Sequence, residues 1–256
     1  MSRLRKVAAL LLAGALAAGT AACAAPAGGG GAEKNLTVFA AASLKAPFTA
    51  LAREFEAGHP GTKVVLSFAG SADLATQLSQ GAPADVFASA DLKNMAKVAD
   101  AGLVAGAPRN FASNVLAIAV PPANPAGIGS FADLAKPGVK VVVCAAQVPC
   151  GAAAKSVEGR SGVALKPVSE ESSVTDVLGK VTSGEADAGL VYVTDVRAAG
   201  SKVRGIPFPE AAAAVNHYPI AALKTSRNQE LSDAFISLVT AAGGRKVLAD
   251  AGFGSP

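Results

Sequence analysis

The chain has 256 residues, of which 51% are hydrophobic and only 5% are aromatic, with no Trp and a formal net charge of +4. A core filled largely by Ala and Val suits helix–sheet contacts better than an aromatic-rich β-sandwich. Arg3, Arg5 and Lys6 supply most of the excess positive charge and no long basic run follows them, which argues against a nucleic-acid-binding surface.

Residues 1–23 have the pattern of an export signal. The apolar run from Val7 to Ala18 follows the basic residues and is too short and too rich in Ala and Gly for a transmembrane helix. Thr20-Ala21-Ala22-Cys23 resembles a bacterial lipobox with Thr in place of the usual Leu, so we expect lipidation of Cys23 and anchoring to the outer face of the cell membrane. Secretion after cleavage at an Ala-x-Ala site is the alternative. Residues 24–34 are expected to form a flexible tether.

Two further cysteines, Cys144 and Cys150, are predicted to form a disulfide, because an isolated pair in an exported protein lies in oxidising surroundings. A catalytic redox pair would need the tighter C-x-x-C spacing, and a zinc site would need more ligands. An exported thiol–disulfide oxidoreductase that uses these cysteines is the alternative from another functional class.

From Leu36 onward, short apolar runs typical of buried strands alternate with helical patterns. The strand-like runs are Leu36–Ala41, Lys63–Phe68, Asp85–Ala88, Asn114–Val120, Val139–Cys144, Ala188–Tyr192, Val203–Phe208 and Tyr218–Leu223. Apolar residues at helical spacing run from Leu44 to Phe55, from Leu74 to Leu78, from Val174 to Val181 and, over a longer stretch, from Leu231 to Ala242. This alternation predicts an α/β fold.

The β-α-β-α-β series occurs twice, which predicts two lobes, each a mostly parallel sheet flanked by helices. We place the first lobe at residues 35–112 and 219–256 and the second lobe at residues 113–218, so that the terminal helices pack on the first lobe. Open α/β sheets bind ligands at the carboxyl ends of their strands. In a two-lobed protein these ends would line a cleft between the lobes.

Two serines stand where an apolar run passes into a helical pattern. Ser43 follows the run Leu36 to Ala42, and Ser71 follows Phe68-Ala69-Gly70. A serine at such a junction can cap the helix, and it lies where free N–H groups and the positive end of the helix dipole meet an anion. Together with Tyr192, the two serines predict a site that holds an anion with hydroxyls and backbone N–H groups.

The chain resembles the periplasmic molybdate-binding proteins of ABC importers in an ordered set of short motifs. These motifs are Leu36–Leu44, Phe68–Ser71, Gln80–Asp91, Val148–Gly151, Gly184–Tyr192 and Tyr218–Ile220. They run in the family's order across nearly all of the chain that follows the tether. The resemblance implies a type II periplasmic-binding-protein fold that closes on its ligand, and a monomeric receptor that passes molybdate, and also tungstate, to a membrane permease.

The resemblance also implies a ligand set. Ser43 and Ser71 match the hydroxyl ligands of the first lobe, Cys150 and Val174 match positions that offer backbone N–H groups, and Tyr192 matches a phenol ligand. The family usually has Ala where Cys150 stands, a change that keeps the backbone donor. Since the anion would be bound through its oxygens, no residue is expected to coordinate the metal directly, and no cofactor or catalytic residue is expected.

Chemistry supports a site without cations. Hydrogen bonds to a charged group contribute about 1.5–3 kcal/mol each, so about seven donors would exceed the roughly 8 kcal/mol of a micromolar complex. Molybdate carries no proton at neutral pH, and a site of donors alone favours it over protonated phosphate. A receptor for another oxyanion such as sulfate, or a sensor without transport, is the alternative. Asp85 and Asp91 are interpreted as structural, and His59 and His217 have no partners that would indicate a metal site.

Overall fold

The computed structural model describes residues 34–256. The predicted export signal, the lipidation site Cys23 and the tether up to residue 33 lie outside the described residues. None of the helices within residues 34–256 has the length and hydrophobicity needed to span a bilayer.

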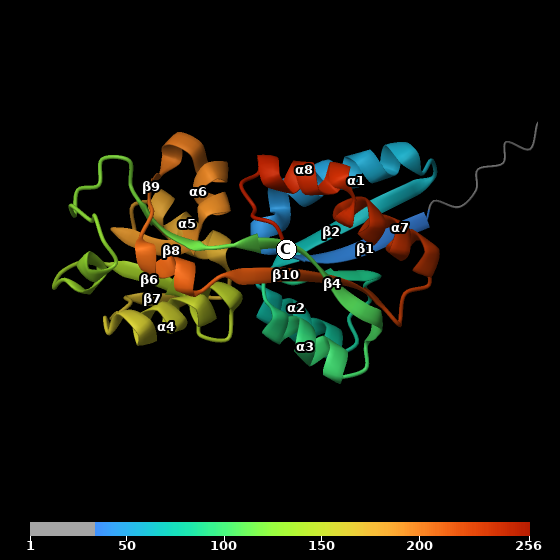
Figure 1. The fold of residues 1–256 in the computed structure, drawn as a ribbon, viewed down its shortest axis with the longest axis horizontal. Helices are drawn as coiled ribbons and strands as arrows, with labels where there is room; N and C mark the ends of the chain where they lie inside the picture. Colours follow the sequence, from blue (N-terminus) through green and yellow to red (C-terminus); the bar gives the residue numbers. More distant parts are fainter. Residues whose placement is uncertain (1–33) are drawn as a thin grey trace, which may run out of the picture. The chain divides into compact units, whose positions relative to one another are not determined.

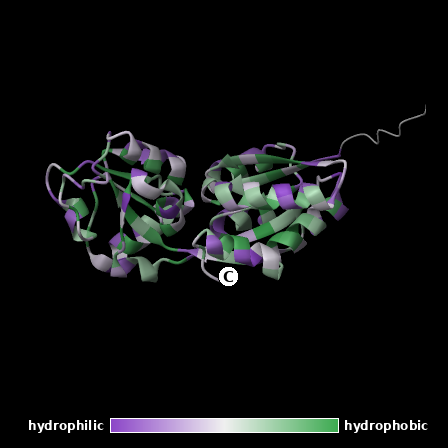
Figure 2. Ribbon diagram, turned by 90° about the horizontal axis from the view of Figure 1, so that it is seen from above, coloured by the Kyte–Doolittle hydropathy of each residue, from purple (hydrophilic) through white to green (hydrophobic). Residues whose placement is uncertain are grey.

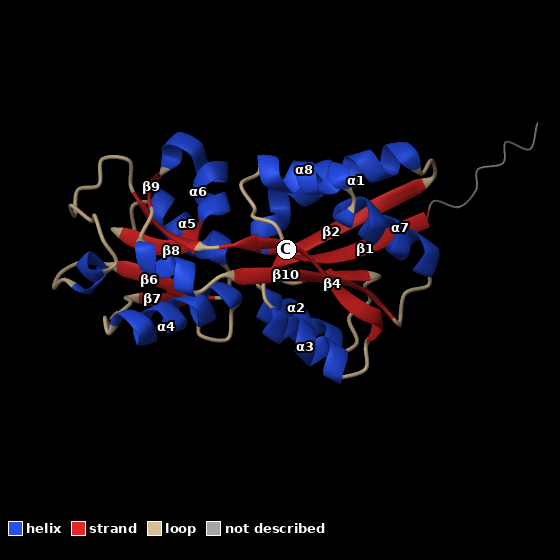
Figure 3. Ribbon diagram, viewed as in Figure 1, coloured by secondary structure: helices blue, strands red, loops and turns tan. Residues whose placement is uncertain are grey.

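Residues 34–256 form two five-stranded sheets, each flanked by its own helices (Figures 1 and 3). The first sheet has the strand order β2-β1-β3-β10-β4, and we call it and its helices the first lobe. Its elements are β1 (Lys34–Ala41), η1 (Ala42–Leu44), α1 (Lys45–Gly58), β2 (Thr62–Ala69), α2 (Ser71–Ser79), β3 (Val86–Ala88), α3 (Leu92–Asp100), β4 (Val104–Asn114), β10 (Asn216–Leu223), α7 (Gln229–Thr240) and α8 (Ala242–Asp250).

The second sheet has the order β7-β6-β8-β5-β9 and defines the second lobe. Its elements are β5 (Leu116–Val120), η2 (Ala132–Ala135), β6 (Val141–Cys144), α4 (Pro149–Ser161), β7 (Ser169–Glu171), α5 (Val174–Thr182), β8 (Ala188–Tyr192), α6 (Val193–Ala199), η3 (Gly200–Lys202), β9 (Arg204–Ile206) and η4 (Pro209–Ala213). In each sheet three neighbouring strands are parallel and the fourth is antiparallel to its neighbours. The predicted α/β fold of two helix-flanked sheets is confirmed, and the lobe boundaries at residues 112 and 218 stay predictions.

The predicted strand Asn114–Val120 is found as β5 (Leu116–Val120), but its first residue, Asn114, belongs to the preceding strand β4. β4 ends at Asn114, β5 begins at Leu116, and they belong to different sheets. The backbone N–H of Val115 donates to the side-chain oxygen of Asn114 at 3.0 Å, a bond outside both ladders. Most of β4 was missed because its middle, from Gly106 to Asn110, is exposed and contains Pro108, which hides the apolar pattern.

Two other elements depart from the expectation. The helical face from Leu231 to Ala242 belongs to two helices, since Ala241 between α7 and α8 has extended backbone angles. At this corner a Cβ on Gly244 would lie 2.2 Å from the Leu238 carbonyl oxygen, so the close approach requires a glycine. The three-residue strand β7 is polar and only partly buried, and it left no periodic signal.

Most buried hydrophobic residues are Ala, Val, Leu and Ile, as the composition predicted, and Phe side chains cluster in the first lobe. Hydrophobic residues gather in the central strands and hydrophilic residues on the outer helices (Figure 2). In the first lobe, Phe235 and Val239 of α7 and Leu248 of α8 pack with Leu36 and Phe48, so the terminal helices complete that core. Ala42 and Ala72 of the first lobe pack within the apolar cluster of the second lobe, which shows that the lobes are in contact.

Candidate functional site

All five predicted ligand residues line one small cavity between the lobes. Its accessible volume is about 10 Å³, the space of roughly one water-sized sphere. Ser43 and Ser71 come from the first lobe, and Cys150, Val174 and Tyr192 come from the second. The other lining residues are Ala41, Ala42, Gly70, Ala90, Val148 and Pro149. No charged side chain is among these described lining residues, so only neutral groups face the cavity.

Three helices begin at this cavity. Ser71 is the first residue of α2, Cys150 the second residue of α4, and Val174 the first residue of α5. The N–H groups of a helix's first turn have no acceptor within the helix, and the helix dipole is positive there. Backbone donors from both lobes therefore surround one point, which is the arrangement that binds anions in many proteins.

Neither serine caps a helix, contrary to the capping role considered from the sequence. Gly70 is the N-cap of α2, and Ser43 lies inside the short helix η1 that precedes α1. The Ser71 hydroxyl oxygen accepts the Ala90 N–H at 3.0 Å, and the Ser43 hydroxyl lies 3.0 Å from the phenol oxygen of Tyr218. Both side chains are thus fixed by tertiary contacts at the edge of the cavity.

Tyr192 is the last residue of β8 and is only 1% exposed. Its phenol oxygen is buried and has no hydrogen-bond partner among the described residues. Such an orphaned polar group destabilises a fold by about 1–3 kcal/mol unless a ligand satisfies it. Burial raises the pKa of the Tyr192 phenol well above its ordinary value, so the group keeps its proton and can act as a donor.

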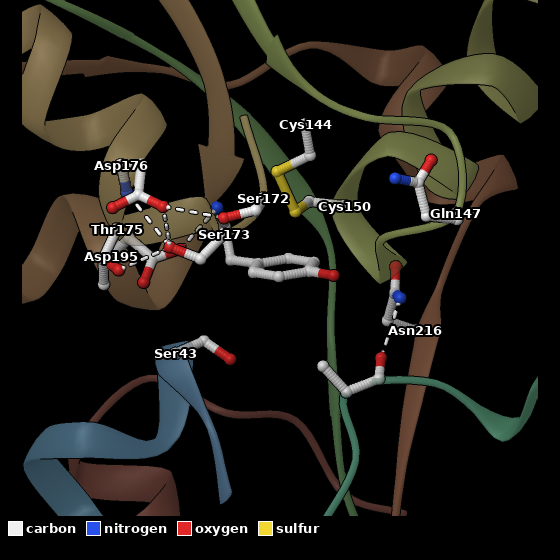
Figure 4. The surroundings of a disulfide bond; sticks show 12 residues. Ser43, Cys144, Gln147, Cys150, Ser172, Ser173, Thr175, Asp176, Asp195 and Asn216 are labelled. Atoms are coloured by element: carbon white, nitrogen blue, oxygen red, sulfur yellow. Dashed lines mark hydrogen bonds between the residues drawn. A yellow bond between two sulfur atoms is a disulfide. The ribbon is translucent and has the colours of Figure 1, made fainter. Parts of the chain in front are cut away.

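The loop that presents Cys150 is held by a disulfide. Cys144, at the end of β6, is bonded to Cys150 in the first turn of α4, as predicted, and Ser43 lies on the opposite side of the site (Figure 4). A Cβ on Gly151 would lie 2.0 Å from the Ala145 carbonyl oxygen, so this tight turn requires glycine.

The two donor loops of the second lobe are also joined to each other. The Ala145 N–H donates to the Glu171 carbonyl oxygen at 2.9 Å, just before the segment that leads to Val174. The Ser173 hydroxyl caps α5 by accepting the Asp176 N–H. The backbone N–H groups of Cys150 and Val174 are consequently presented from a cross-linked frame.

The acidic residues singled out in the sequence have structural partners. Asp91 caps α3 by accepting the Asn94 N–H at 2.8 Å, and Asp85 accepts the Thr37 N–H at 2.7 Å. The His59 ring stacks on Phe55 with 4.0 Å between ring centroids. Within residues 34–256 no group of three His, Cys, Asp or Glu side chains is arranged to hold a metal ion. These contacts agree with the structural interpretation of both aspartates.

Sequence reasoning missed the buried polar residues that lie behind Ser43. Tyr218 and Asn114 form a buried hydrogen-bonded group that reaches Ser43. Tyr218 lies in one of the ordered motifs, which marked the residue as characteristic of the family but did not indicate its contact with Ser43. Gly70 was also in a motif, yet only the structure shows that a Cβ there would lie 2.0 Å from the Ser172 carbonyl oxygen of the other lobe.

A larger hollow of about 410 Å³ lies elsewhere on the first lobe, beside Thr37, Asp85 and Arg227. It contains none of the five predicted residues. Thr37 lies in the first half of β1, whereas the cavity with Ser43 lies beyond the carboxyl end of that strand. The position at the carboxyl ends of the strands, rather than the size of the hollow, identifies the candidate site.

Comparison with known proteins agrees with this geometry. Residues 36–254 match the family model described as bacterial extracellular solute-binding protein. The chain is 54% identical over 223 residues to the molybdate-binding protein ModA of Mycobacterium tuberculosis H37Rv, with 87% of this chain and 85% of that protein covered. It is 34% identical over 207 residues to ModA of Escherichia coli K12, with 77% and 80% covered.

A solved structure with a similar fold is the periplasmic molybdate-binding protein of Azotobacter vinelandii. The TM-score is 0.73 at 22% sequence identity, and the match covers 86% of this chain and 99% of that chain. At this identity the likeness concerns the fold alone.

Proposed function

The chain belongs to the family of bacterial extracellular solute-binding proteins, and on that premise we propose that it captures molybdate, and also tungstate, for delivery to the permease of an ABC importer. The observation that carries the proposal is the cavity between the lobes. It is lined by the hydroxyl-bearing side chains of Ser43, Ser71 and Tyr192 and by the first turns of three helices. Molybdate is the ligand named for relatives that share 54% and 34% of their aligned residues with this chain.

The donor set suits a dianion that carries no proton. Three hydroxyls and the backbone N–H groups of Ser43, Ser71, Cys150 and Val174 supply about seven hydrogen bonds, each worth roughly 1.5–3 kcal/mol to a charged partner. This gain offsets the large loss of hydration when a dianion leaves water. Because no described carboxylate faces the cavity, a protonated anion such as hydrogen phosphate would find no acceptor for its proton.

Rival functions have less support. A sulfate receptor would share the charge and shape of the ligand, and the distinction from molybdate rests on the relatives. A thiol–disulfide oxidoreductase is not favoured, because the comparisons identify binding proteins and the disulfide braces a ligand loop. The proposal includes no chemical step and no cofactor. Lipid anchoring through Cys23 and a monomeric state belong to the same proposal; the first rests on the lipobox-like sequence and the second on the family resemblance.

Isothermal titration of the purified chain with molybdate, tungstate, sulfate and phosphate tests the proposal. We expect tight 1:1 binding of molybdate and tungstate and at least about 100-fold weaker binding of the other two anions. Ser71→Ala should weaken molybdate binding about 10–100-fold, since one charge-assisted hydrogen bond is lost. Ser79→Ala is the matched control, because Ser79 lies at the exposed end of the same helix. Heat with sulfate but none with molybdate would reverse the assignment.

A further inference from the structure

A buried chain of hydrogen-bonding groups lies behind Ser43. We propose that Tyr218 is a positioning residue that donates its phenol proton to Ser43, and thereby forces the Ser43 hydroxyl to act as a donor toward the bound anion. The inference rests on the proposed function, since it concerns how that site selects an anion without a proton.

The Asn114 amide has a fixed orientation. Its oxygen accepts the Val115 N–H at 3.0 Å, so its NH₂ group faces the other way. The NH₂ nitrogen lies 2.8 Å from the Thr194 hydroxyl and 3.5 Å from the Tyr218 phenol oxygen. An amide NH₂ only donates. The Tyr218 oxygen therefore accepts a hydrogen bond from Asn114, and the phenol has to direct its own O–H toward another acceptor.

Among the described residues, the Tyr218 O–H has one hydrogen-bond acceptor, the Ser43 hydroxyl oxygen. Tyr218 is fully buried, and its phenol oxygen lies 3.0 Å from the Ser43 hydroxyl oxygen. Its ring is held edge-on by Phe111, Phe253 and Tyr192, with centroids 5.3–6.3 Å apart. Burial raises the pKa of the Tyr218 phenol, so the proton is retained. The proton consequently points to Ser43.

Ser43 must then direct its own proton away from Tyr218. Its side chain lies at the wall of the cavity, so the proton is available to an anion there. Ser71 is constrained in the same way by a different group, because its oxygen accepts the Ala90 N–H, which can only donate. Each serine oxygen thus accepts one hydrogen bond from behind the cavity, from a backbone N–H group at Ser71 and from a tyrosine that can be altered at Ser43, which leaves its O–H for the anion.

The test is a double-mutant cycle on molybdate affinity, measured by isothermal titration. Tyr218→Phe keeps the ring contacts and removes only the hydroxyl, and we expect about tenfold weaker binding. In a Ser43→Ala background the same substitution should change affinity by less than about twofold, because its target is gone. In a Ser71→Ala background, the matched control, the full tenfold effect should remain. Equal losses in the Ser43→Ala and Ser71→Ala backgrounds would assign Tyr218 a merely structural role and overturn the inference.

The ratio of the affinities for molybdate and phosphate gives a second measurement, which a simple loss of packing would not change. Without the tyrosine O–H, the Ser43 oxygen is more readily available to accept a hydrogen bond from a protonated ligand. At about pH 8, where phosphate carries one proton, Tyr218→Phe should narrow the affinity gap between molybdate and phosphate about tenfold. An unchanged gap would contradict the inference.

The two proposals fail in different ways. If the wild-type chain binds sulfate and not molybdate, the proposed ligand is wrong, and the cycle is run with sulfate to decide the role of Tyr218. Binding of molybdate with no coupling between Tyr218 and Ser43 leaves the proposed function and removes the inference. Absence of binding to any of the four anions overturns both.

Discussion

At the scale of single residues, the site depends on side chains that the surrounding protein leaves incompletely satisfied. The Tyr192 phenol has no described partner, while the backbone N–H of the same residue donates to the Asp195 carboxylate at 2.9 Å. Asp195 is itself only 5% exposed, and within residues 34–256 its side chain accepts no other hydrogen bond. Burial raises the pKa of Asp195 to about 7, since a charged carboxylate is poorly solvated there.

This raised pKa predicts that stability falls as pH rises. The folded protein binds the proton more tightly than the unfolded chain, whose carboxyl has an ordinary pKa of 3.8. Asp195 therefore contributes most below about pH 4, and the contribution is lost between about pH 4 and pH 7, on the order of 4 kcal/mol in total. In Asp195→Asn, urea unfolding at pH 5 and pH 8 should show a smaller loss of stability than the wild type. The exposed Asp100→Asn variant is the control, and an equal pH dependence in Asp195→Asn would contradict the assignment.

At the scale of elements, the sequence predicted what depends on buried periodic patterns. The strand Ala188–Tyr192 has the predicted bounds, and most of the other predicted strands were found within two residues. Central strands such as β5 and β8 are buried on both faces, so their apolar runs are continuous. β4 and β7 were missed because exposed residues and Pro108 interrupt or replace that pattern. Their places are set by pairing with distant strands, which a local pattern does not record.

The candidate site shows the same division. Ser43, Ser71 and Tyr192 stand at strand ends, and their convergence could be predicted because strand ends share one edge of a sheet. The roles of Cys150 and Val174 as backbone donors came from the resemblance, since a backbone donor leaves no mark on the side chain. The contact of Asn114 with Tyr218 joins residues 104 positions apart, and nothing in either local sequence indicates it.

The disulfide is the element-scale feature with the clearest test. It closes a short loop between β6 and α4, and the loss of chain entropy in the unfolded state predicts about 2 kcal/mol of stabilisation. Replacing both Cys144 and Cys150 with Ser should lower the urea midpoint accordingly, with an unchanged slope. A reductant should lower the midpoint of the wild type and leave the variant unaffected. Molybdate affinity should fall about two- to tenfold, because the backbone donor of residue 150 is kept but its loop is less fixed.

At the scale of residues 34–256 as a whole, anion binding requires the lobes to come very close together. One close approach is made by backbone alone, where Gly70 of the first lobe meets the Ser172 carbonyl of the second. A side-chain hydrogen bond also crosses, from the Asn94 amide to the Gln147 carbonyl at 3.3 Å. Three of the proposed donors, those of Cys150, Val174 and Tyr192, reach the cavity only in this arrangement.

Gly70→Ala is therefore expected to disable binding without touching the anion. The added Cβ would lie 2.0 Å from the Ser172 oxygen. Because both positions are fixed by backbone, the clash can be relieved only if the lobes move apart. Ligand contacts would be limited to the first lobe, and the loss of about three donors predicts at least about 100-fold weaker molybdate binding. Titration calorimetry measures this loss, and small-angle scattering should show compaction on adding molybdate in the wild type but not in Gly70→Ala.

The matched control is Gly179→Ala in α5, where a Cβ meets nothing within 4 Å. Because the Gly70 contact lies between the lobes rather than inside either core, the melting temperature without ligand should stay close to that of the wild type. Wild-type affinity in Gly70→Ala would show that the anion is held without this approach of the lobes.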